Sequence, residues 1–445
     1  MKYKDSFVHT VCALAVPVAL QSMLQSSFSI VDQIMIGQLG SVSIAGVGLA
    51  GKFSSIYSVV VSAVGAVAGI MIAQYLGQKD SGQVRRSFWG NLLPSGGLAA
   101  AFMAVCLLFP QQIMGLYTQD QSTRQAAAEY LAVIAWTFLP MAGATLMAAL
   151  FRCMEKARYP LYASIVSAVL NSVLNYILIF GKLGFAPMGA RGAAIATVVS
   201  QLANCLIMLI LLPLIRCDWD DSAQDHKAGR FQWRQYASML LPILVCEVLW
   251  SVGENVYAMI YGQMGTQAAA AMTLINPVQG LLIGALCGLS QAASVLVGKR
   301  LGSGEYDLAY KEAKKLIWYG TVGAVALSIV VVLSSGAYIR IYNIEPEVRQ
   351  LTRPILFAYA LVAPFKVLNM IVGGGILRSG GKTKVAMIID TIGTWGFGVP
   401  LGLTAAFVLE LPIPAVYFLL SLEEAVRVVI SLVVFRKKIW MQSLQ

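Results

Sequence analysis

The chain has 445 residues, of which 58% are hydrophobic and only 12% are charged, and its mean hydropathy is +0.73. Soluble globular proteins carry about 25% charged residues, so this composition excludes an ordinary soluble domain and indicates a polytopic membrane protein. Seven scattered cysteines without a CxxC pair and only two histidines give no pattern typical of disulfides or of a metal site.

Twelve segments are apolar enough and long enough to span a bilayer, which requires about 20 mostly apolar residues. The first apolar run continues to Gly37, well past the length of a signal peptide, and therefore predicts an uncleaved first helix. The sequence thus predicts an all-α membrane protein with spans at residues 8–37, 44–75, 88–109, 124–151, 160–181, 191–215, 237–261, 268–298, 315–335, 352–377, 385–409 and 413–435.

Lysine and arginine are concentrated on one side of these spans. If the N-terminus is cytoplasmic, 23 of the 32 lysines and arginines lie in inner segments, as the positive-inside rule requires. We therefore expect a multi-pass protein of the plasma membrane with both termini in the cytoplasm. The net charge of +11 follows from this topology, so we expect no nucleic-acid partner.

A charge-rich inner segment divides the spans into six and six, which predicts an N-lobe at 1–215, a cytoplasmic linker at 216–236 and a C-lobe at 237–445. Residues recur between the halves at an offset of 225–226, as with Pro17 and Pro242 or GQLG from Gly37 and GQMG from Gly262. Because each half has an even number of helices, both copies enter from the same side. The repeat predicts two six-helix lobes related by a pseudo-twofold axis along the membrane normal, which is typical of alternating-access carriers.

Polar residues in the first span recur at steps of three and four, and so share one helix face. A charged residue near the bilayer centre costs about 2.5–3.5 kcal/mol, so an acid on this face indicates a functional site. Adding 225 to positions on this face gives residues of the seventh span, among them two glutamates, so both spans are expected to line one cavity. The alternative is that a glutamate there faces the inner or outer rim of the membrane and is simply solvated. The acid is Asp32, and the expected cavity residues are Gln21, Gln25, Ser29, Glu247, Ser251 and Glu254.

Asn171 and Asn175 lie one turn apart in the fifth span, and Thr197 lies in the sixth. Their oxygens are hard donors that, together with Asp32, suit a small cation such as Na⁺. The alternative is that the two asparagines only form hydrogen bonds between helices.

The C-terminal half contains further charged residues within its spans. Glu423 is predicted to pair with Arg427 four residues later, whereas Asp390 and Glu424 are candidate proton carriers. Lys366 is expected to neutralise nearby carboxylates, and so is Lys52 in the first half, although either could snorkel toward the interface.

The segment GGGILRSGGKTK is similar to a phosphate-binding loop, but the position five residues before Gly381 is Ile376 where that motif requires glycine. A short connection between two spans is also the wrong context for it. We therefore expect no nucleotide partner and no drive by ATP.

Several segments resemble the multidrug and toxic compound extrusion (MATE) transporters: VDQIMIGQLG in the first span, LNSVLNYILIFG leading to GARGAAIAT, and GILRSGGKTK after the tenth. The resemblance implies export of organic cations and amphiphiles coupled to Na⁺ or H⁺, without an organic cofactor. It also implies that the N-lobe cation site of this family corresponds to Asp32, Asn171, Asn175 and Thr197. The chain departs from some members at Asn175, where they have a second acid, and in lacking an aspartate in the tenth span.

The leading hypothesis is a monomeric, cation-coupled multidrug antiporter that works by alternating access, with small cationic or amphiphilic substrates and the lipid bilayer as partners. One alternative is a lipid-linked oligosaccharide flippase of the same broad architecture, which tends to line its cavity with cations, whereas the predicted faces here are acidic. A membrane-embedded enzyme is the other alternative, and no catalytic histidine, cysteine pair or metal motif supports it.

Overall fold

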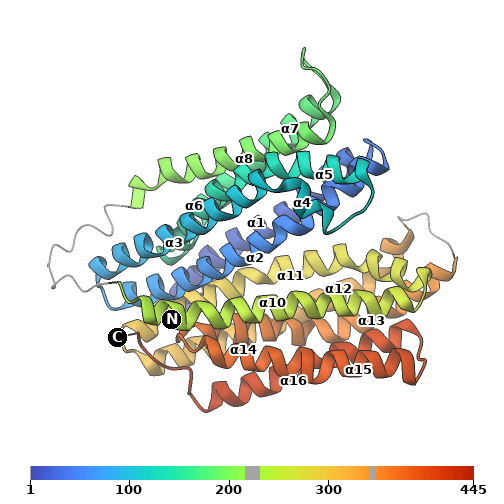
Figure 1. Cartoon of the computed structure of the whole chain (residues 1–445). Coiled ribbons are helices and arrows are strands. Elements are labelled where there is room, and N and C mark those ends of the chain that lie inside the picture. Colours follow the sequence, from blue (N-terminus) through green and yellow to red (C-terminus); the bar gives the residue numbers. More distant parts are fainter. Residues whose placement is uncertain (1, 216–230, 341–345, 445) are drawn as a thin grey trace. The chain divides into compact units, whose positions relative to one another are not determined.

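The computed structural model describes residues 2–215, 231–340 and 346–444 (Figure 1). Within these ranges the chain folds into helices and connecting loops, with no strand, which confirms the predicted all-α class. Residues 216–230, which make up most of the predicted cytoplasmic linker, lie outside the described residues.

The N-terminal half consists mainly of long helices joined by short loops. The segments α5, η1 and α6 follow one another without a break and together form one apolar span, Gln121–Cys153. The elements are α1 (Lys2–Gly37), α2 (Ser41–Gly77), α3 (Ser81–Leu108), α4 (Pro110–Gly115), α5 (Gln121–Ile134), η1 (Ala135–Thr137), α6 (Phe138–Cys153), α7 (Arg158–Phe180) and α8 (Gly189–Leu211).

The C-terminal half has the same pattern, but three stretches of it are π-helical: η2, η3 and η4. Each continues directly from the preceding α-helix, so two spans contain π-helical turns. The elements are α10 (Trp233–Gln263), α11 (Thr266–Gly302), α12 (Tyr306–Arg340), α13 (Pro346–Asn369), η2 (Met370–Leu377), α14 (Thr383–Thr391), η3 (Ile392–Gly398), α15 (Val399–Leu403), η4 (Thr404–Val408) and α16 (Ile413–Arg436).

Eleven helices of the described chain are long and apolar enough to cross a membrane. The twelfth predicted span is α16, a 24-residue helix that differs from these eleven by three charged residues in its middle, Glu423, Glu424 and Arg427. Some helices extend beyond their predicted spans; the ninth, expected at 315–335, runs from Tyr306 to Arg340. Hydropathy marks the bilayer rather than the end of the helix, and the lysines and glutamate before residue 315 are good helix formers.

Residue contacts divide the chain into two compact units. We call them the N-unit, Leu20–Ile72 with Asp80–Phe231, and the C-unit, which contains Gln232–Gln445 together with Met1–Ala19 and Ala73–Lys79. The lobe boundaries near residues 215 and 237 stay a prediction.

The end of α2 packs in the C-unit because two glycines allow its backbone to meet that of α11. A Cβ on Gly77 would overlap the Lys299 carbonyl, and a Cβ on Gly302 would overlap the Gln74 carbonyl. Both pairs are 225 residues apart in the repeat, Gly77 with Gly302 and Gln74 with Lys299.

Candidate functional site

The candidate site in the N-unit is built on the close packing of α7 against α8 (Figure 1). Gly192, in the first turn of α8, makes this packing possible, because a Cβ there would lie 2.7 Å from the Leu178 carbonyl oxygen of α7. Asn171 and Asn175, one turn apart on α7, are 8% and 1% exposed. Two amide side chains in such a buried position need polar partners.

Asp32 of α1 is one of these partners. Its Oδ1 accepts a hydrogen bond from Asn175 Nδ2 at 2.8 Å, and the Asp32 side chain is half-buried. Asn171 lies beside the same carboxylate and is also next to Thr197 of α8. The structure therefore brings together the four residues that the sequence grouped as a cation site.

The amide of Asn171 turns its nitrogen toward Asp32 and its oxygen toward α8. The nitrogen lies 3.0 Å from both carboxylate oxygens of Asp32, and the oxygen accepts a hydrogen bond from Ser200 Oγ at 3.3 Å. This orientation stabilises a charged carboxylate, because amide N–H groups donate and carboxylate oxygens accept.

No lysine or arginine of the described chain forms an ion pair with Asp32, so its neighbours in the site are neutral. In addition, the Asn175 carbonyl oxygen Oδ1 is buried and accepts no hydrogen bond. A carboxylate and an unused carbonyl oxygen in one place form a donor set for a small hard cation or a proton.

Two residues of this site were not predicted. Ser200 is three residues after Thr197 on α8, and this spacing could have revealed it. Tyr130 of α5 interacts electrostatically with Asp32, and nothing in the sequence signalled this interaction.

The other polar residues predicted on α1 do not form a cluster with Asp32. Gln21 donates to Ser164 Oγ of α7 at 2.8 Å, so it joins two helices. Gln25 and Ser29 are exposed. Lys52 of α2 is also exposed and pairs with no carboxylate among residues 2–215, 231–340 and 346–444, which fits snorkelling rather than neutralisation.

The C-unit contains a cavity of about 330 Å³. Glu254 of α10 lines it and is exposed, and Lys366 of α13 lines it within electrostatic reach of both Glu254 and Glu424. Four tyrosines contribute to the wall, Tyr257, Tyr261, Tyr359 and Tyr417. A polar, aromatic-walled space of this size can hold a small organic molecule.

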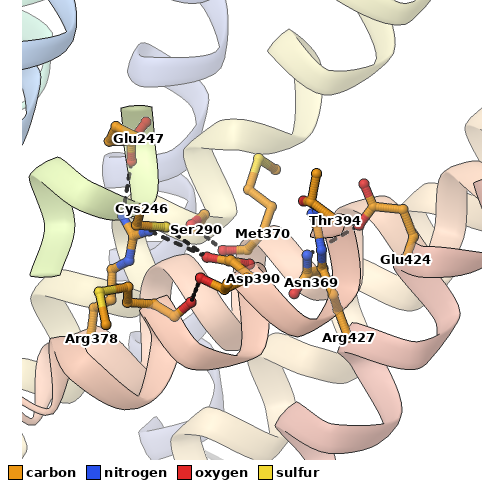
Figure 2. A network of polar contacts seen from close by, with 12 residues as sticks. Cys246, Glu247, Ser290, Asn369, Met370, Arg378, Asp390, Thr394, Glu424 and Arg427 are labelled. Atoms are coloured by element: carbon orange, nitrogen blue, oxygen red, sulfur yellow. Dashed lines mark hydrogen bonds and ion pairs between the residues drawn. The ribbon is translucent and has the colours of Figure 1, made fainter. Parts of the chain in front are cut away.

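Beside this cavity, Arg427 of α16 forms a buried ion cluster (Figure 2). Its guanidinium is 3.1 Å from Glu423 Oε1 and 3.6 Å from Glu424 Oε2, and it donates to Thr394 Oγ1. The predicted Glu423–Arg427 pair is thus confirmed. Glu424, predicted as a proton carrier, shares the same arginine and also accepts from Asn369 Nδ2 at 3.1 Å.

Glycines in η3 explain how this cluster fits between helices. A Cβ on Gly393 would overlap the Arg427 side chain, and one on Gly398 would overlap Glu423 and the Tyr257 hydroxyl, which donates to Glu423. The absence of side chains at these positions lets η3 lie directly on the charged groups.

A second cluster surrounds Arg378, just after η2 (Figure 2). Arg378 lies 3.3 Å from Glu247 Oε1 and 3.7 Å from Asp390 Oδ2. The Cys246 thiol donates to the same Asp390 oxygen at 3.0 Å. Glu247 and Asp390, which the sequence placed in different roles, therefore share one arginine that the sequence assigned only to a loop.

The three residues predicted on one face of α10 therefore have different surroundings. Glu247 belongs to the Arg378 cluster, and Glu254 lines the cavity. Ser251, between them, is half-buried, and its carbonyl accepts from Asn255 at 2.7 Å.

Known proteins share this architecture. The chain is 27% identical over 417 residues to the probable multidrug resistance protein NorM of Brucella suis biovar 1 (strain 1330), covering 88% of this chain and 84% of NorM. The crystal structure of a MATE transporter in complex with MaL6 matches with a TM-score of 0.88 at 17% identity, covering 96% of this chain and 95% of that one. A mutant of the Vibrio cholerae MATE transporter VcmN matches equally well, with a TM-score of 0.88 at 17% identity and 98% of each chain covered.

These structural matches confirm a fold of twelve transmembrane helices in two lobes. The family model of MatE matches residues 17–177 and 242–404, which is most of both halves. The chain therefore belongs to the MatE family of multidrug and toxic compound extrusion transporters and is a transporter, not an enzyme.

Proposed function

We propose that the chain exports organic cations and amphiphilic drugs by alternating access in exchange for Na⁺ or H⁺, and that Asp32 is where the coupling ion binds. The observation that supports this most strongly is the half-buried Asp32 carboxylate, whose described partners are all neutral. An unpaired acid within a membrane span is costly, and binding a cation removes that cost.

The amides beside Asp32 suggest how the site holds the ion. Without an ion, the amide nitrogens of Asn171 and Asn175 both donate to the Asp32 carboxylate. When a proton or Na⁺ neutralises Asp32, the oxygens of Asn175 and Thr197 complete the donor set. Because α1, α7 and α8 contribute these groups, ion binding changes how the three helices hold one another.

Exchange of one cation for another removes the electrical work of exporting a cation. Export of a monovalent cation against 100 mV costs about 2.3 kcal/mol. Exchange for one incoming monovalent ion cancels this electrical work, and each tenfold ion gradient then supplies about 1.4 kcal/mol. Antiport requires that ion and cargo weaken each other's binding, which is a reciprocal coupling between two sites.

We assign attraction of the cationic cargo to Glu254. Among the predicted cavity residues, its carboxylate is exposed and lines the 330 Å³ cavity, whereas Glu247 is paired with Arg378. The names of the NorM relatives support multidrug cargo. The excess of lysine and arginine in the inner segments supports a plasma-membrane protein with both termini in the cytoplasm, and we propose that it acts as a monomer.

The proposal is tested with purified protein in liposomes without ATP. We expect an imposed inward gradient of Na⁺ or H⁺, each applied separately, to drive ethidium out of the compartment that represents the cytoplasm. Dissipating the gradient with a matching ionophore should stop the movement. Transport that requires ATP, or that runs at the same rate without either gradient, would rule the mechanism out.

Glu254→Gln should weaken ethidium transport about tenfold, because it removes a negative charge in a partly desolvated cavity, where a nearby opposite charge contributes on the order of 1–4 kcal/mol. The measurement is the concentration of ethidium at half-maximal transport, compared with that of a neutral amphiphile. Glu129→Gln, at an exposed acid of α5, is the matched control. An equal loss for charged and neutral cargo would show that Glu254 does not act on cargo charge.

A further inference from the structure

The Arg427 cluster and the Asp32 cluster occupy equivalent places in the two halves of the repeat. The Asp32 cluster joins the first, fifth and sixth spans of the N-terminal half, α1, α7 and α8. The Arg427 cluster joins the first, fifth and sixth spans of the C-terminal half, through Tyr257, Thr394 and Glu423.

The sequence offset supports this equivalence. Adding 225 to Asp32 gives Tyr257, and adding 226 to Thr197 gives Glu423, and these two residues are hydrogen-bonded to each other. In both halves, the sixth span thus contributes an oxygen ligand to a polar group that includes a residue of the first span.

The two clusters differ in their charges. Asp32 has neutral partners and an unused carbonyl oxygen beside it, whereas Glu423 and Glu424 surround a guanidinium. Two carboxylates with the Asn369 amide, the Tyr257 hydroxyl and the Thr394 hydroxyl would otherwise form an oxygen-rich cation site.

From this comparison we propose that the C-terminal half contains a second ion site whose cation is permanently supplied by Arg427. The transporter then exchanges a single coupling ion per cycle, at Asp32. This inference rests on the proposed coupling role of Asp32 and adds the number of ions to it.

Arg427 keeps a mobile cation out for an electrostatic reason. Its side chain is 4% exposed, and arginine stays charged in proteins. Because a guanidinium carries one positive charge, Arg427 alone leaves Glu423 and Glu424 with one net negative charge. Lys366, which lines the same cavity and interacts electrostatically with Glu424, supplies the second positive charge, so the group has no net charge to attract a mobile cation.

The other buried or half-buried acids in the described spans of the C-unit also pair with arginine, as Glu312 of α12 does with Arg300. Glu247 and Asp390 share Arg378 in the same manner. Glu254 is exposed on the cavity, where we have assigned it to cargo. Arg378 and Arg427 therefore each pair with two acids of this half, and in this proposal Asp390 and Glu424 do not act as proton carriers.

The number of coupling ions can be measured as a thermodynamic ratio in proteoliposomes held at zero membrane potential. With one ion per cycle, a tenfold ion gradient supports about a tenfold ethidium gradient at equilibrium, and with two ions about a hundredfold gradient. We expect the tenfold value. We also expect that Asp32→Asn removes all saturable ²²Na⁺ binding, or all proton release upon addition of ethidium.

The cluster is tested by a triple variant, Glu423→Gln with Glu424→Gln and Arg427→Gln, which removes its charges together. We expect the tenfold ratio to be unchanged in this variant, even if ethidium affinity shifts, because the cluster carries no mobile ion. A hundredfold ratio in the wild type would overturn the inference, as would ion binding that survives Asp32→Asn and disappears when the triple change is added.

These outcomes separate the two proposals. If no ion gradient drives ethidium in the wild type, the proposed function fails. If gradients drive transport with two ions, that function stands and the inference about Arg427 fails. If the triple variant does not fold, the wild-type ratio and ion binding to Asp32→Asn still decide the question.

Discussion

Asp32→Asn should abolish ion-driven ethidium export while leaving ethidium binding within tenfold of the wild type. The substitution keeps the shape and hydrogen-bonding capacity of the side chain and removes the charge that a coupling ion would neutralise. Because neutral asparagine cannot take up a proton or attract Na⁺ in the same way, the ion gradient loses its point of action. Transport in proteoliposomes with an imposed gradient and ethidium binding in detergent measure the two effects separately.

Asp80→Asn is the matched control for this change. Asp80 caps α3 by accepting from the Gln83 amide at 2.9 Å, and asparagine serves equally well at that position, so export should be unchanged. If Asp32→Asn exports at the wild-type rate under the same gradient, Asp32 only holds α1 to α7, and the proposed mechanism is wrong.

Arg427→Gln should destabilise the protein by about 3–5 kcal/mol, the usual consequence of removing one partner of a buried ion pair. Glu423 and Glu424 would remain buried at 5% exposure each, without the guanidinium that pairs with both. The expected result is a large fall in the temperature of unfolding and in the yield of monodisperse protein, measured in detergent by intrinsic fluorescence and size-exclusion chromatography.

Adding Glu423→Gln and Glu424→Gln to Arg427→Gln should restore most of the lost stability, because no unpaired charge then stays buried. Arg436→Gln, at an exposed position on the same helix, is the matched control and should change stability by no more than about 0.5 kcal/mol. If the single Arg427→Gln variant unfolded at the same temperature as the wild type, the two glutamates would not depend on this arginine.

The sequence by itself determined the spans and, in outline, the Asp32 cluster. A spanning helix satisfies its own backbone hydrogen bonds and exposes apolar side chains to lipid, so hydropathy located the spans to within a few residues, although not the charged ends of helices such as α12. Asn171 and Asn175 were predicted to meet Asp32 because they share one helix face and an acid within a membrane needs partners. The Glu423–Arg427 pair was predictable from its spacing of four residues.

Only the tertiary structure decided which distant charges meet. Arg378 contacts Glu247, 131 residues away, and Cys246 contacts Asp390, 144 residues away. No helical periodicity connects such positions, because their contact depends on how α10 packs against α14 and the turn after η2. For the same reason Glu247 and Glu254, on one predicted face of α10, have different surroundings: one lies against an arginine, and the other lines an open cavity.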